Sequence, residues 1–262
     1  MKKYLVIGNP IDHSLSPKLH NYWFKKNNIN AIYESKQLKE EEIKNLINGI
    51  RYGEISGINV TVPFKKSVIP FLDILTDEAK ISKSVNTIYK ENEKIIGHNT
   101  DIVGFKLGIK KIYNPENKKI LILGAGGVVP SLIIALYQMN VSKIYLSNRT
   151  HQRALELKEQ FKDIELIKWG QVPDVEMLIN ATSLGLKSDD KINLNFEKSD
   201  KKKFYYDVIY NPHKTNFLRE AEKKGNITEN GKLMFIFQAQ QAFKIWHKIE
   251  PEIDENINEV FK

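Results

Sequence analysis

The 262-residue sequence contains no cysteine, which excludes disulfide bridges, thiol nucleophiles and thiolate metal sites. Its six histidines are scattered, with no H-E-x-x-H motif or other paired spacing, so we predict no metal site. A G-x-S-x-G nucleophile elbow is also missing, which argues against hydrolase chemistry of that kind. Because 41% of the residues are hydrophobic and 27% are charged, we expect a globular protein. The absence of cysteine is compatible with a cytoplasmic enzyme and not with a small secreted scaffold.

The sequence also lacks a long uninterrupted hydrophobic run. The uncharged stretch 120–141 has about the length of a membrane span, but glycines and Pro130 interrupt it. We interpret this stretch as a strand, a tight turn and a buried helix. The first apolar run, residues 4–7, is too short for the core of a signal peptide. We therefore predict no membrane segment.

Positive charge is in moderate excess, with a net charge of +8. The basic residues are mostly interleaved with acidic ones, as in KEEEIKN (39–45) and LKEQFKD (157–163). This pattern is typical of a solvated surface, and we predict no nucleic-acid binding. A small anionic substrate or a phosphorylated cofactor also suits a mildly basic protein.

Strand-like runs alternate with longer amphipathic runs along the chain, which predicts α/β structure built on parallel sheets. The alternation falls into two units that divide near residues 101–106. The runs that we interpret as strands are 4–8, 31–35, 57–62 and 86–90 in the first unit, and 119–123, 143–147, 164–169, 175–180 and 204–210 in the second. A long helix is predicted over 232–249.

A glycine-rich turn lies directly between the predicted strand 119–123 and the helix that follows it. In such a turn the first glycine permits the tight bend, and the second lets the backbone approach a pyrophosphate at the helix N-terminus. The last small residue of this dinucleotide-binding pattern is replaced by Val129. The predicted cofactor contacts of the turn are Gly124, Ala125, Gly126, Gly127 and Val128.

The strand 143–147 is followed by polar and basic residues rather than by an acid. An NAD site usually carries a carboxylate here for the ribose 2′-hydroxyl, whereas guanidinium groups suit the 2′-phosphate of NADP. We therefore prefer NADP over NAD and predict cofactor contacts at Asn148, Arg149, Thr150 and Arg153. The alternative is that Thr150 caps a helix and both arginines are merely solvated.

The segment GINVTVPFK (57–65) alternates strictly, with Ile58, Val60 and Val62 on one face and Asn59 and Thr61 on the other. Pro63 ends the predicted strand, and Lys65 falls on or near the turn beyond it. Taken alone, the pair Lys65-Lys66 favours the interpretation of Lys65 as an ordinary surface charge.

Other polar segments favour a functional interpretation of Lys65. In an open parallel sheet, segments just after the strand ends meet at one edge, which is the usual ligand crevice. Such convergence would bind a small polyhydroxylated acid, with Asp101 holding Lys65 charged and oriented. The polar residues that we expect at this edge include Ser14, Ser16, Asn59, Thr61, Asn86, Asn99, Thr100 and Asp101.

These motifs, taken in order, resemble those of the shikimate dehydrogenase family, and the resemblance covers nearly the whole chain. They are GNPIDHSLSP (8–17), NVTVPFK (59–65), VNT (85–87), NTD (99–101), GAGG (124–127), NRT (148–150), NATSLG (180–185) and Gln238. The resemblance implies NADPH-dependent, reversible reduction of 3-dehydroshikimate to shikimate in aromatic amino-acid biosynthesis. It also implies a substrate-binding domain, 1–101 plus 232–262, and a Rossmann-type doubly wound NADP-binding domain, 102–231. A homodimer is among the assemblies we expect.

The resemblance also implies roles for individual residues. Lys65 and Asp101 would be the catalytic pair, and Ser14 and Ser16 would bind the substrate carboxylate. Asn59, Thr61, Asn86, Asp101 and Gln238 would meet the substrate hydroxyls, with Tyr210 near the carboxylate. The remaining implied cofactor contacts are Val208, Gly231 and Asp77.

Some positions depart from the family pattern, and rival interpretations remain. Ile102 and Leu233 stand where the family usually has glycine, and Val129 with Pro130 alters the glycine-rich turn. One rival is a quinate/shikimate dehydrogenase that uses NAD, against which Arg149 and the two serines argue. The other is a cofactor-binding protein without turnover, against which the Lys65–Asp101 pair argues.

Overall fold

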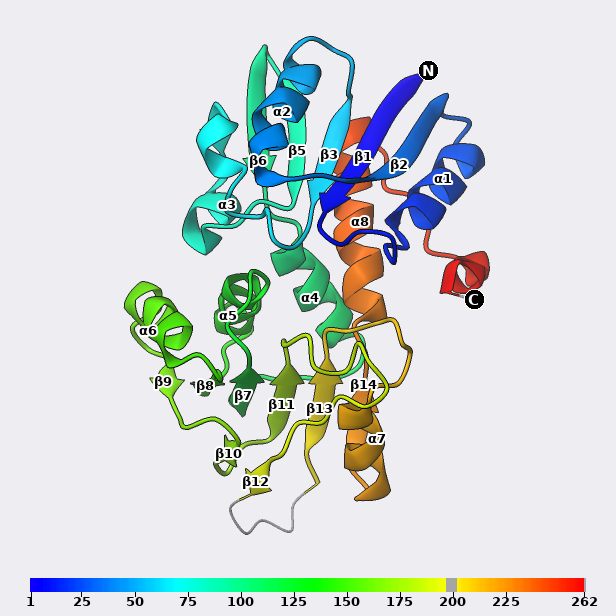
Figure 1. Cartoon of the computed structure of the whole chain (residues 1–262). Helices are drawn as coiled ribbons and strands as arrows, with labels where there is room; N and C mark the ends of the chain where they lie inside the picture. Colours follow the sequence, from blue (N-terminus) through cyan, green and yellow to red (C-terminus); the bar gives the residue numbers. More distant parts are fainter. Residues whose placement is uncertain (197–201, 262) are drawn as a thin grey trace. The chain divides into compact units, whose positions relative to one another are not determined.

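The computed structural model describes residues 1–196 and 202–261. The chain divides into two compact units, Met1–Gly104 with Ile236–Lys262 and Phe105–Phe235 (Figure 1). The divisions fall inside α4 (Asp101–Lys110) and α8 (Lys232–His247). The domain boundaries predicted from the sequence lie at the starts of these same two helices, and their assignment to functions stays a prediction.

The first unit is built on one sheet with the strand order β2-β1-β3-β5-β6-β4. β1, β2 and β3 run parallel, whereas β5 is antiparallel to both of its neighbours. Its strands are β1 (Lys2–Gly8), β2 (Ala31–Gln37), β3 (Gly57–Val60), β4 (Ile74–Leu75), β5 (Thr87–Glu91) and β6 (Lys94–His98).

The first sheet is therefore mixed, whereas the sequence predicted a parallel sheet. β5 and β6 are joined by only Asn92 and Glu93, both of which adopt positive φ, 48° and 63°. So short a connection can join only antiparallel strands, because a parallel pair needs a long crossover. The reversal places the start of β5 beside the end of β3, which decides where Asn86 lies.

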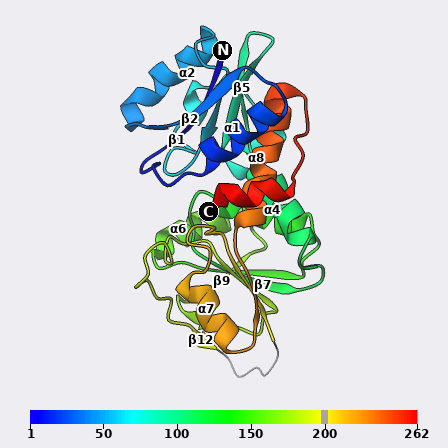
Figure 2. The ribbon, with the colours of Figure 1, turned by 90° about the vertical axis from the view of Figure 1, so that its right-hand side faces the viewer.

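Helices cover both faces of the first sheet. On one face, α2 and α3 pack on a core that contains Leu5, Ile7, Ile58 and Val60. On the other face, α1 and α8 contribute an aromatic cluster that includes Trp23; α2 and α8 are seen on opposite sides of the strands in Figure 2. The helices are α1 (Ser16–Lys26), α2 (Ile43–Arg51) and α3 (Asp77–Ser82), with 3₁₀ turns η1 (Glu40–Glu42), η2 (Ile69–Phe71) and η3 (Glu255–Phe261).

The second unit contains a sheet in which every pairing is parallel, as the sequence predicts. Its order is β14-β13-β11-β7-β8-β9. Numbered along the chain, this is the 3-2-1-4-5-6 order of the doubly wound dinucleotide-binding fold, whose ligand crevice lies where the order reverses. That reversal falls between β7 and β11. The strands are β7 (Lys119–Leu123), β8 (Lys143–Ser147), β9 (Glu165–Leu166), β11 (Met177–Asn180), β13 (Phe204–Asp207) and β14 (Ile227–Glu229).

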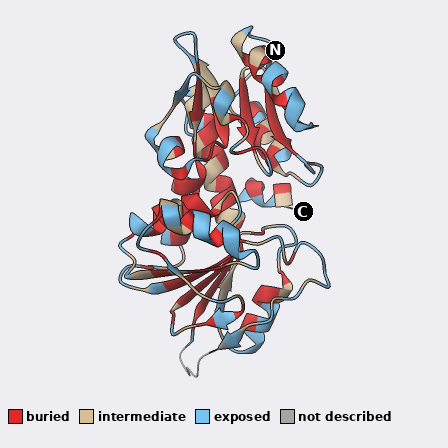
Figure 3. Ribbon diagram, turned by 60° about the vertical axis from the view of Figure 1, so that its left-hand side comes forward, coloured by how far each residue is buried: buried red, intermediate tan, exposed pale blue. Residues whose placement is uncertain are grey.

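Both faces of this sheet are buried. Leu121 and Leu123 point to the α7 side, where they pack with Phe217, whereas Ile120 and Ile122 alternate to the opposite face, and all four are 0% exposed. Figure 3 shows the buried strands and the partly exposed helices around them. The remaining elements are α5 (Val129–Tyr137), α6 (His151–Gln160), α7 (Asn216–Lys223) and the small pair β10 (Gln171–Val172) with β12 (Asn195–Phe196).

The uncharged stretch 120–141 folds as predicted, into β7, a turn and the buried helix α5. Within the described parts of the chain, no helix has the length and apolarity needed to cross a membrane.

Candidate active site

Lys65 lies in a loop that follows β3 and is anchored on both sides in the core. Phe64 is 3% exposed and Val68 is 0% exposed, while the Lys65 carbonyl accepts a hydrogen bond from the Val85 amide at 2.9 Å. Lys65 itself is 8% exposed, in contrast to its exposed neighbour Lys66. The two lysines therefore have different environments, and Lys65 is not an ordinary surface charge.

The strand before this loop is shorter than its alternating pattern indicates. β3 ends at Val60, and Val62 is 60% exposed rather than on the core face. Residues 62–68 form turns, so no helix begins at Lys65. The loop leaves the sheet early because Pro63 cannot donate to a strand ladder.

Asp101 is the first residue of α4 and is 5% exposed. Its Oδ2 atom lies 2.5 Å from Lys65 Nζ, and its Oδ1 atom accepts a hydrogen bond from Asn86 Nδ2 at 2.9 Å. A helix N-terminus favours negative charge, which suits a carboxylate at this position. The structure thus brings the predicted pair together and fixes both carboxylate oxygens.

Asn86 is held by its own network. Its Oδ1 accepts from the Thr100 amide at 2.8 Å and from the Thr87 hydroxyl at 3.0 Å. Its Nδ2 donates to the Thr100 hydroxyl at 2.9 Å and lies 3.5 Å from Oε1 of Gln238 on α8. The amide that orients Asp101 is therefore itself oriented, because each of its polar atoms has a partner.

The other predicted substrate residues of the first unit lie at the same sheet edge. β1 and β3 are parallel, so the loops that follow them leave on one side, and the Asn9 amide donates to the Val62 carbonyl at 3.0 Å. Ser14 and Ser16 lie in the loop after β1 and at the start of α1, where the Ser16 amide donates to Ser14 Oγ at 3.3 Å. Thr61 lies directly beyond β3.

Asn59, in β3, faces this edge from within the sheet and is 7% exposed. Its Nδ2 donates to the Asn86 carbonyl and to the Thr87 hydroxyl, both at 3.0 Å. Its Oδ1 accepts from the Tyr33 hydroxyl at 2.7 Å. Sequence reasoning missed Tyr33 and Thr87, because nothing in the local pattern of a strand residue shows what its side chain meets across the sheet.

In the second unit, the glycine-rich turn sits at the reversal of strand order. Gly124 has φ +111°, and a Cβ there would lie 2.7 Å from the Ala181 carbonyl oxygen beyond β11. A Cβ on Gly126 would meet only that oxygen, at 3.9 Å. Gly124 is therefore required by the fold, whereas Gly126 leaves open space beside its backbone. That space is the cradle that a pyrophosphate needs, and it fits a dinucleotide.

The segment after β8 is exposed and basic. Asn148 Nδ2 donates to the Thr150 carbonyl at 2.7 Å, and Thr150 is the N-cap residue of α6, although its side chain makes no capping hydrogen bond. No hydrogen bond or ion pair ties the guanidinium of Arg149 or Arg153 to another described residue. These side chains are available to a phosphate, and the turn contains no carboxylate that would repel it.

A buried carboxylate organises the carboxyl ends of β11 and β13. Asp207 accepts from the Thr215 hydroxyl at 2.6 Å, the Ile209 amide at 3.0 Å and Asn180 Nδ2 at 3.1 Å. Burial raises the pKa of Asp207 to about 6, although these hydrogen bonds act in the opposite direction. The neighbouring Val208 amide donates to the Asn180 carbonyl at 3.0 Å, so this network fixes the loop that carries Val208.

The remaining residues that the family resemblance implies as ligand contacts lie in different parts of the chain. Val208 and Gly231 lie together, since a Cβ on Gly231 would come within 2.1 Å of the Val208 carbonyl oxygen. Tyr210 packs its ring on Phe235, with centroids 4.4 Å apart, in the second unit. Asp77 begins α3 in the first unit, is exposed and lies 3.2 Å from Lys80 Nζ. The roles of all these residues toward ligands stay predictions.

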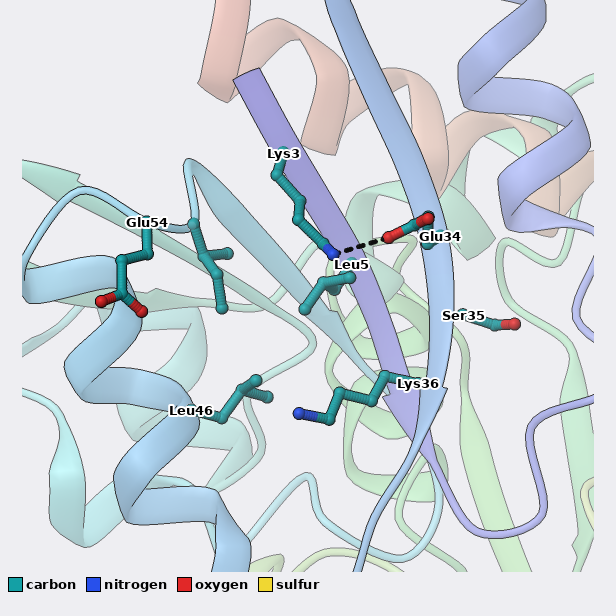
Figure 4. Close-up of a pocket in the computed structure, with 8 residues that line it drawn as sticks. Lys3, Leu5, Glu34, Ser35, Lys36, Leu46 and Glu54 are labelled. Atoms are coloured by element: carbon teal, nitrogen blue, oxygen red, sulfur yellow. Dashed lines mark ion pairs between the residues drawn. The ribbon is translucent and has the colours of Figure 1, made fainter. Parts of the chain in front are cut away.

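Among the described residues, no group of three or more histidine, aspartate or glutamate side chains could hold a metal ion. A separate groove on the first sheet is lined by Lys3, Leu5, Glu34, Ser35, Lys36, Leu46, Glu54 and Ile55. In Figure 4, Lys3 pairs with Glu34 at 2.8 Å and Lys36 extends toward Leu46. None of the predicted site residues lines this groove.

Comparisons with known proteins identify the family of the chain. Residues 6–88 match the family model described as shikimate dehydrogenase substrate binding domain, and residues 106–204 match the one described as shikimate / quinate 5-dehydrogenase. A curated NADP(+) shikimate dehydrogenase from Pelagibacter ubique is 64% identical over 259 residues, 98% of each chain. The chain belongs to the shikimate dehydrogenase family.

Solved structures of shikimate dehydrogenases share the whole fold. The enzyme from Thermus thermophilus in complex with NADP(H) and shikimate superposes with a TM-score of 0.89 at 30% identity, covering 100% of this chain and 98% of that one. The enzyme from Aquifex aeolicus gives a TM-score of 0.87 at 35% identity, covering 100% and 97%. The predicted family and the α/β fold class are thereby confirmed.

The departures from the shikimate dehydrogenase pattern are accommodated inside the fold. Ile102 is 1% exposed near the start of α4, and Val129 is 0% exposed at the start of α5. Leu233, at the start of α8, packs against α4 where that helix carries Gly108: a Cβ on Gly108 would lie 3.4 Å from Leu233 Cβ.

Proposed function

We propose that the chain catalyses the reversible, NADPH-dependent reduction of 3-dehydroshikimate to shikimate, an oxidoreductase reaction at a CH–OH group in aromatic amino-acid biosynthesis. The observation that carries the proposal is the buried contact of Lys65 Nζ with Asp101 Oδ2, with Asn86 on the second carboxylate oxygen. A buried amine held by a carboxylate is suited to general acid–base catalysis.

In the proposed mechanism, Lys65 donates a proton to the carbonyl oxygen of the substrate and takes it back in the reverse direction. Asp101 holds the ammonium in place, and the Asn86 network holds Asp101. When bound, NADPH supplies the hydride. Ser14 and Ser16 bind the substrate carboxylate, while Asn59, Thr61, Asn86, Asp101 and Gln238 meet its hydroxyls and Tyr210 lies near its carboxylate.

We assign substrate binding to the first unit and NADP binding to the second. The cofactor contacts are Gly124, Ala125, Gly126, Gly127, Val128, Asn148, Arg149, Thr150, Arg153, Val208 and Gly231, with Asp77 as a neighbour from the first unit. The open backbone at Gly126 and the unpaired guanidinium of Arg149 support this assignment. The enzyme works, in this proposal, in the cytoplasm as a homodimer and binds no nucleic acid, which fractionation, light scattering and a gel-shift assay can check.

Initial rates of shikimate and quinate oxidation, each with NADP and with NAD, test the function. We expect a strong preference for shikimate with NADP. Comparable rates with quinate or NAD would retain the catalytic pair but overturn the specificity. If none of the four combinations is turned over, the protein is a cofactor-binding protein without enzymatic activity on these substrates.

A further inference from the structure

Tyr33 reaches the substrate-binding edge from β2, although its strand position indicates only an ordinary core residue. It is 1% exposed, and its hydroxyl lies 2.7 Å from Oδ1 of Asn59 on β3, two strands away in the sheet. This hydrogen bond joins a side chain of the aromatic cluster to the polar network around Asn86. It is the feature on which the inference rests.

The orientation of the Asn59 amide follows from its partners. The Asn86 carbonyl is an acceptor only, so the atom that faces it at 3.0 Å must be Nδ2, which also donates to the Thr87 hydroxyl. Oδ1 therefore faces Tyr33 and accepts a hydrogen bond from its hydroxyl. Both Nδ2 hydrogens are donated in these hydrogen bonds. After the three bonds, one lone pair of Oδ1 remains able to accept a further hydrogen bond.

The ring of Tyr33 is held so that its hydroxyl has little freedom to move. The imidazole of His20, on α1, stacks on it with centroids 4.3 Å apart and planes 1° from parallel, and Trp246 of α8 lies 6.2 Å away. His20 is 0% exposed, and neither of its ring nitrogens has a hydrogen-bond partner among the described residues. His20 thus acts as a flat packing surface beneath Tyr33.

We propose that Tyr33 is a positioning residue that acts through Asn59. By occupying one lone pair of Oδ1, it locks the amide so that Asn59 meets the bound acid as an acceptor only. The site therefore requires a substrate hydroxyl that donates at this point and disfavours an analogue with an ether oxygen there. This inference rests on the proposed function, since it concerns the same substrate.

Tyr33→Phe, which removes the hydroxyl and keeps the ring, tests the inference. Tyr4→Phe is the matched control: Tyr4 is 2% exposed, pairs with Tyr33 in register on the neighbouring strand and contacts Trp246 rather than Asn59. We expect kcat/KM for shikimate to fall on the order of tenfold in Tyr33→Phe, with KM for NADP unchanged. Tyr4→Phe should stay within about twofold of wild type.

A double-mutant cycle and a binding measurement separate positioning from general stabilisation. In an Asn59→Ala background, Tyr33→Phe should change kcat/KM for shikimate by less than about twofold, because the group through which it acts is gone. If Asn59→Ala does not fold, the shikimate affinities of Tyr33→Phe and Tyr4→Phe are measured by calorimetry instead. Only Tyr33→Phe should bind shikimate more weakly than wild type.

The outcomes that overturn the inference are distinct. Equal losses in Tyr33→Phe and Tyr4→Phe, or additive losses in the cycle, assign Tyr33 a merely structural role. Unchanged shikimate kinetics in Tyr33→Phe overturn the inference alone and leave the proposed function in place. A wild-type protein that does not oxidise shikimate overturns the proposed function and this inference with it.

Discussion

Lys65 Nζ and Asp101 Oδ2 lie 2.5 Å apart, although 36 positions separate the two residues in the sequence. The lysine comes from the loop after β3, and the aspartate begins α4. Asn86, just before the antiparallel strand β5, holds the second oxygen of the carboxylate. Three separate segments therefore build one buried hydrogen-bonded group, and its proposed role in proton transfer can be tested residue by residue.

Lys65→Ala should lower kcat for shikimate oxidation about 100-fold or more, because the positioned proton carrier is lost. Its affinity for NADPH should stay near that of wild type, since Lys65 lies in the first unit and we assign NADP binding to the second. Steady-state kinetics and a fluorescence titration with NADPH measure the two quantities. Lys66→Ala is the control, because Lys66 is the exposed neighbour and should leave kcat unchanged. An unchanged kcat in Lys65→Ala removes Lys65 from the mechanism.

Gly124→Ala should lower the stability of the protein, whereas Gly126→Ala should lower its affinity for NADP. Gly124 has φ +111°, and its new methyl would lie 2.7 Å from a backbone oxygen, so the first variant should lose about 2 kcal/mol or more of stability. Gly126→Ala should keep its stability but bind NADP at least about tenfold more weakly, because the methyl fills the space for the pyrophosphate. Urea unfolding and NADP titration distinguish them. Equal stability losses would show that Gly126 also serves the fold.

Arg149→Asp should raise KM for NADPH on the order of 30-fold while changing KM for NADH less than about threefold, since only NADPH carries the 2′-phosphate. Kinetics with both cofactors measure the ratio. Lys168→Asp makes the same charge change at another exposed position of the second unit and should leave the ratio unaltered. If both cofactors lose affinity equally, Arg149 has a structural role.

His20 should make the protein less stable in weak acid. Burial, and to a lesser extent His247, lowers the pKa of His20 to about 3. The unfolded chain therefore binds a proton that the folded chain does not over the range from about pH 6.5 to 3, and stability falls as the pH falls through it. Between pH 7 and pH 5, the titration of His20 should lower the free energy of unfolding by about 2 kcal/mol.

The His20 effect is measured as the difference in urea-unfolding free energy between wild type and His20→Phe, which keeps a flat ring against Tyr33. The comparison is needed because Asp207 acts in the opposite direction: burial raises its pKa to about 6, so its contribution rises as the pH falls from 6 toward 3.8. The unfolding free energy of His20→Phe relative to that of wild type should rise by about 2 kcal/mol from pH 7 to pH 5. A constant difference at both pH values would show that His20 is protonated in the folded protein or neutral in both states.

Sequence reasoning worked best where the determining interactions are local. The turn at Gly124 and the helix after it follow from glycine, proline and hydrophobic periodicity within about twenty residues. The strands β7, β8 and β11 and their parallel direction follow from the same alternation. It was least successful for β3 and β5, because the exposure of Val62 and the antiparallel direction of β5 depend on the neighbouring strands.

By itself, the sequence determined the α/β class, the glycine-rich turn and the set of polar segments, since each of these depends on residues close together in the chain. Only the tertiary structure decided that Lys65 is buried against Asp101, that Gly124 serves the fold while Gly126 leaves space, and that Tyr33 orients Asn59. Each of these depends on atoms brought together from distant segments, 26 positions apart for Tyr33 and Asn59. Local propensity and periodicity carry no information about such pairs, because the partner of a buried polar group is chosen by strand order and register.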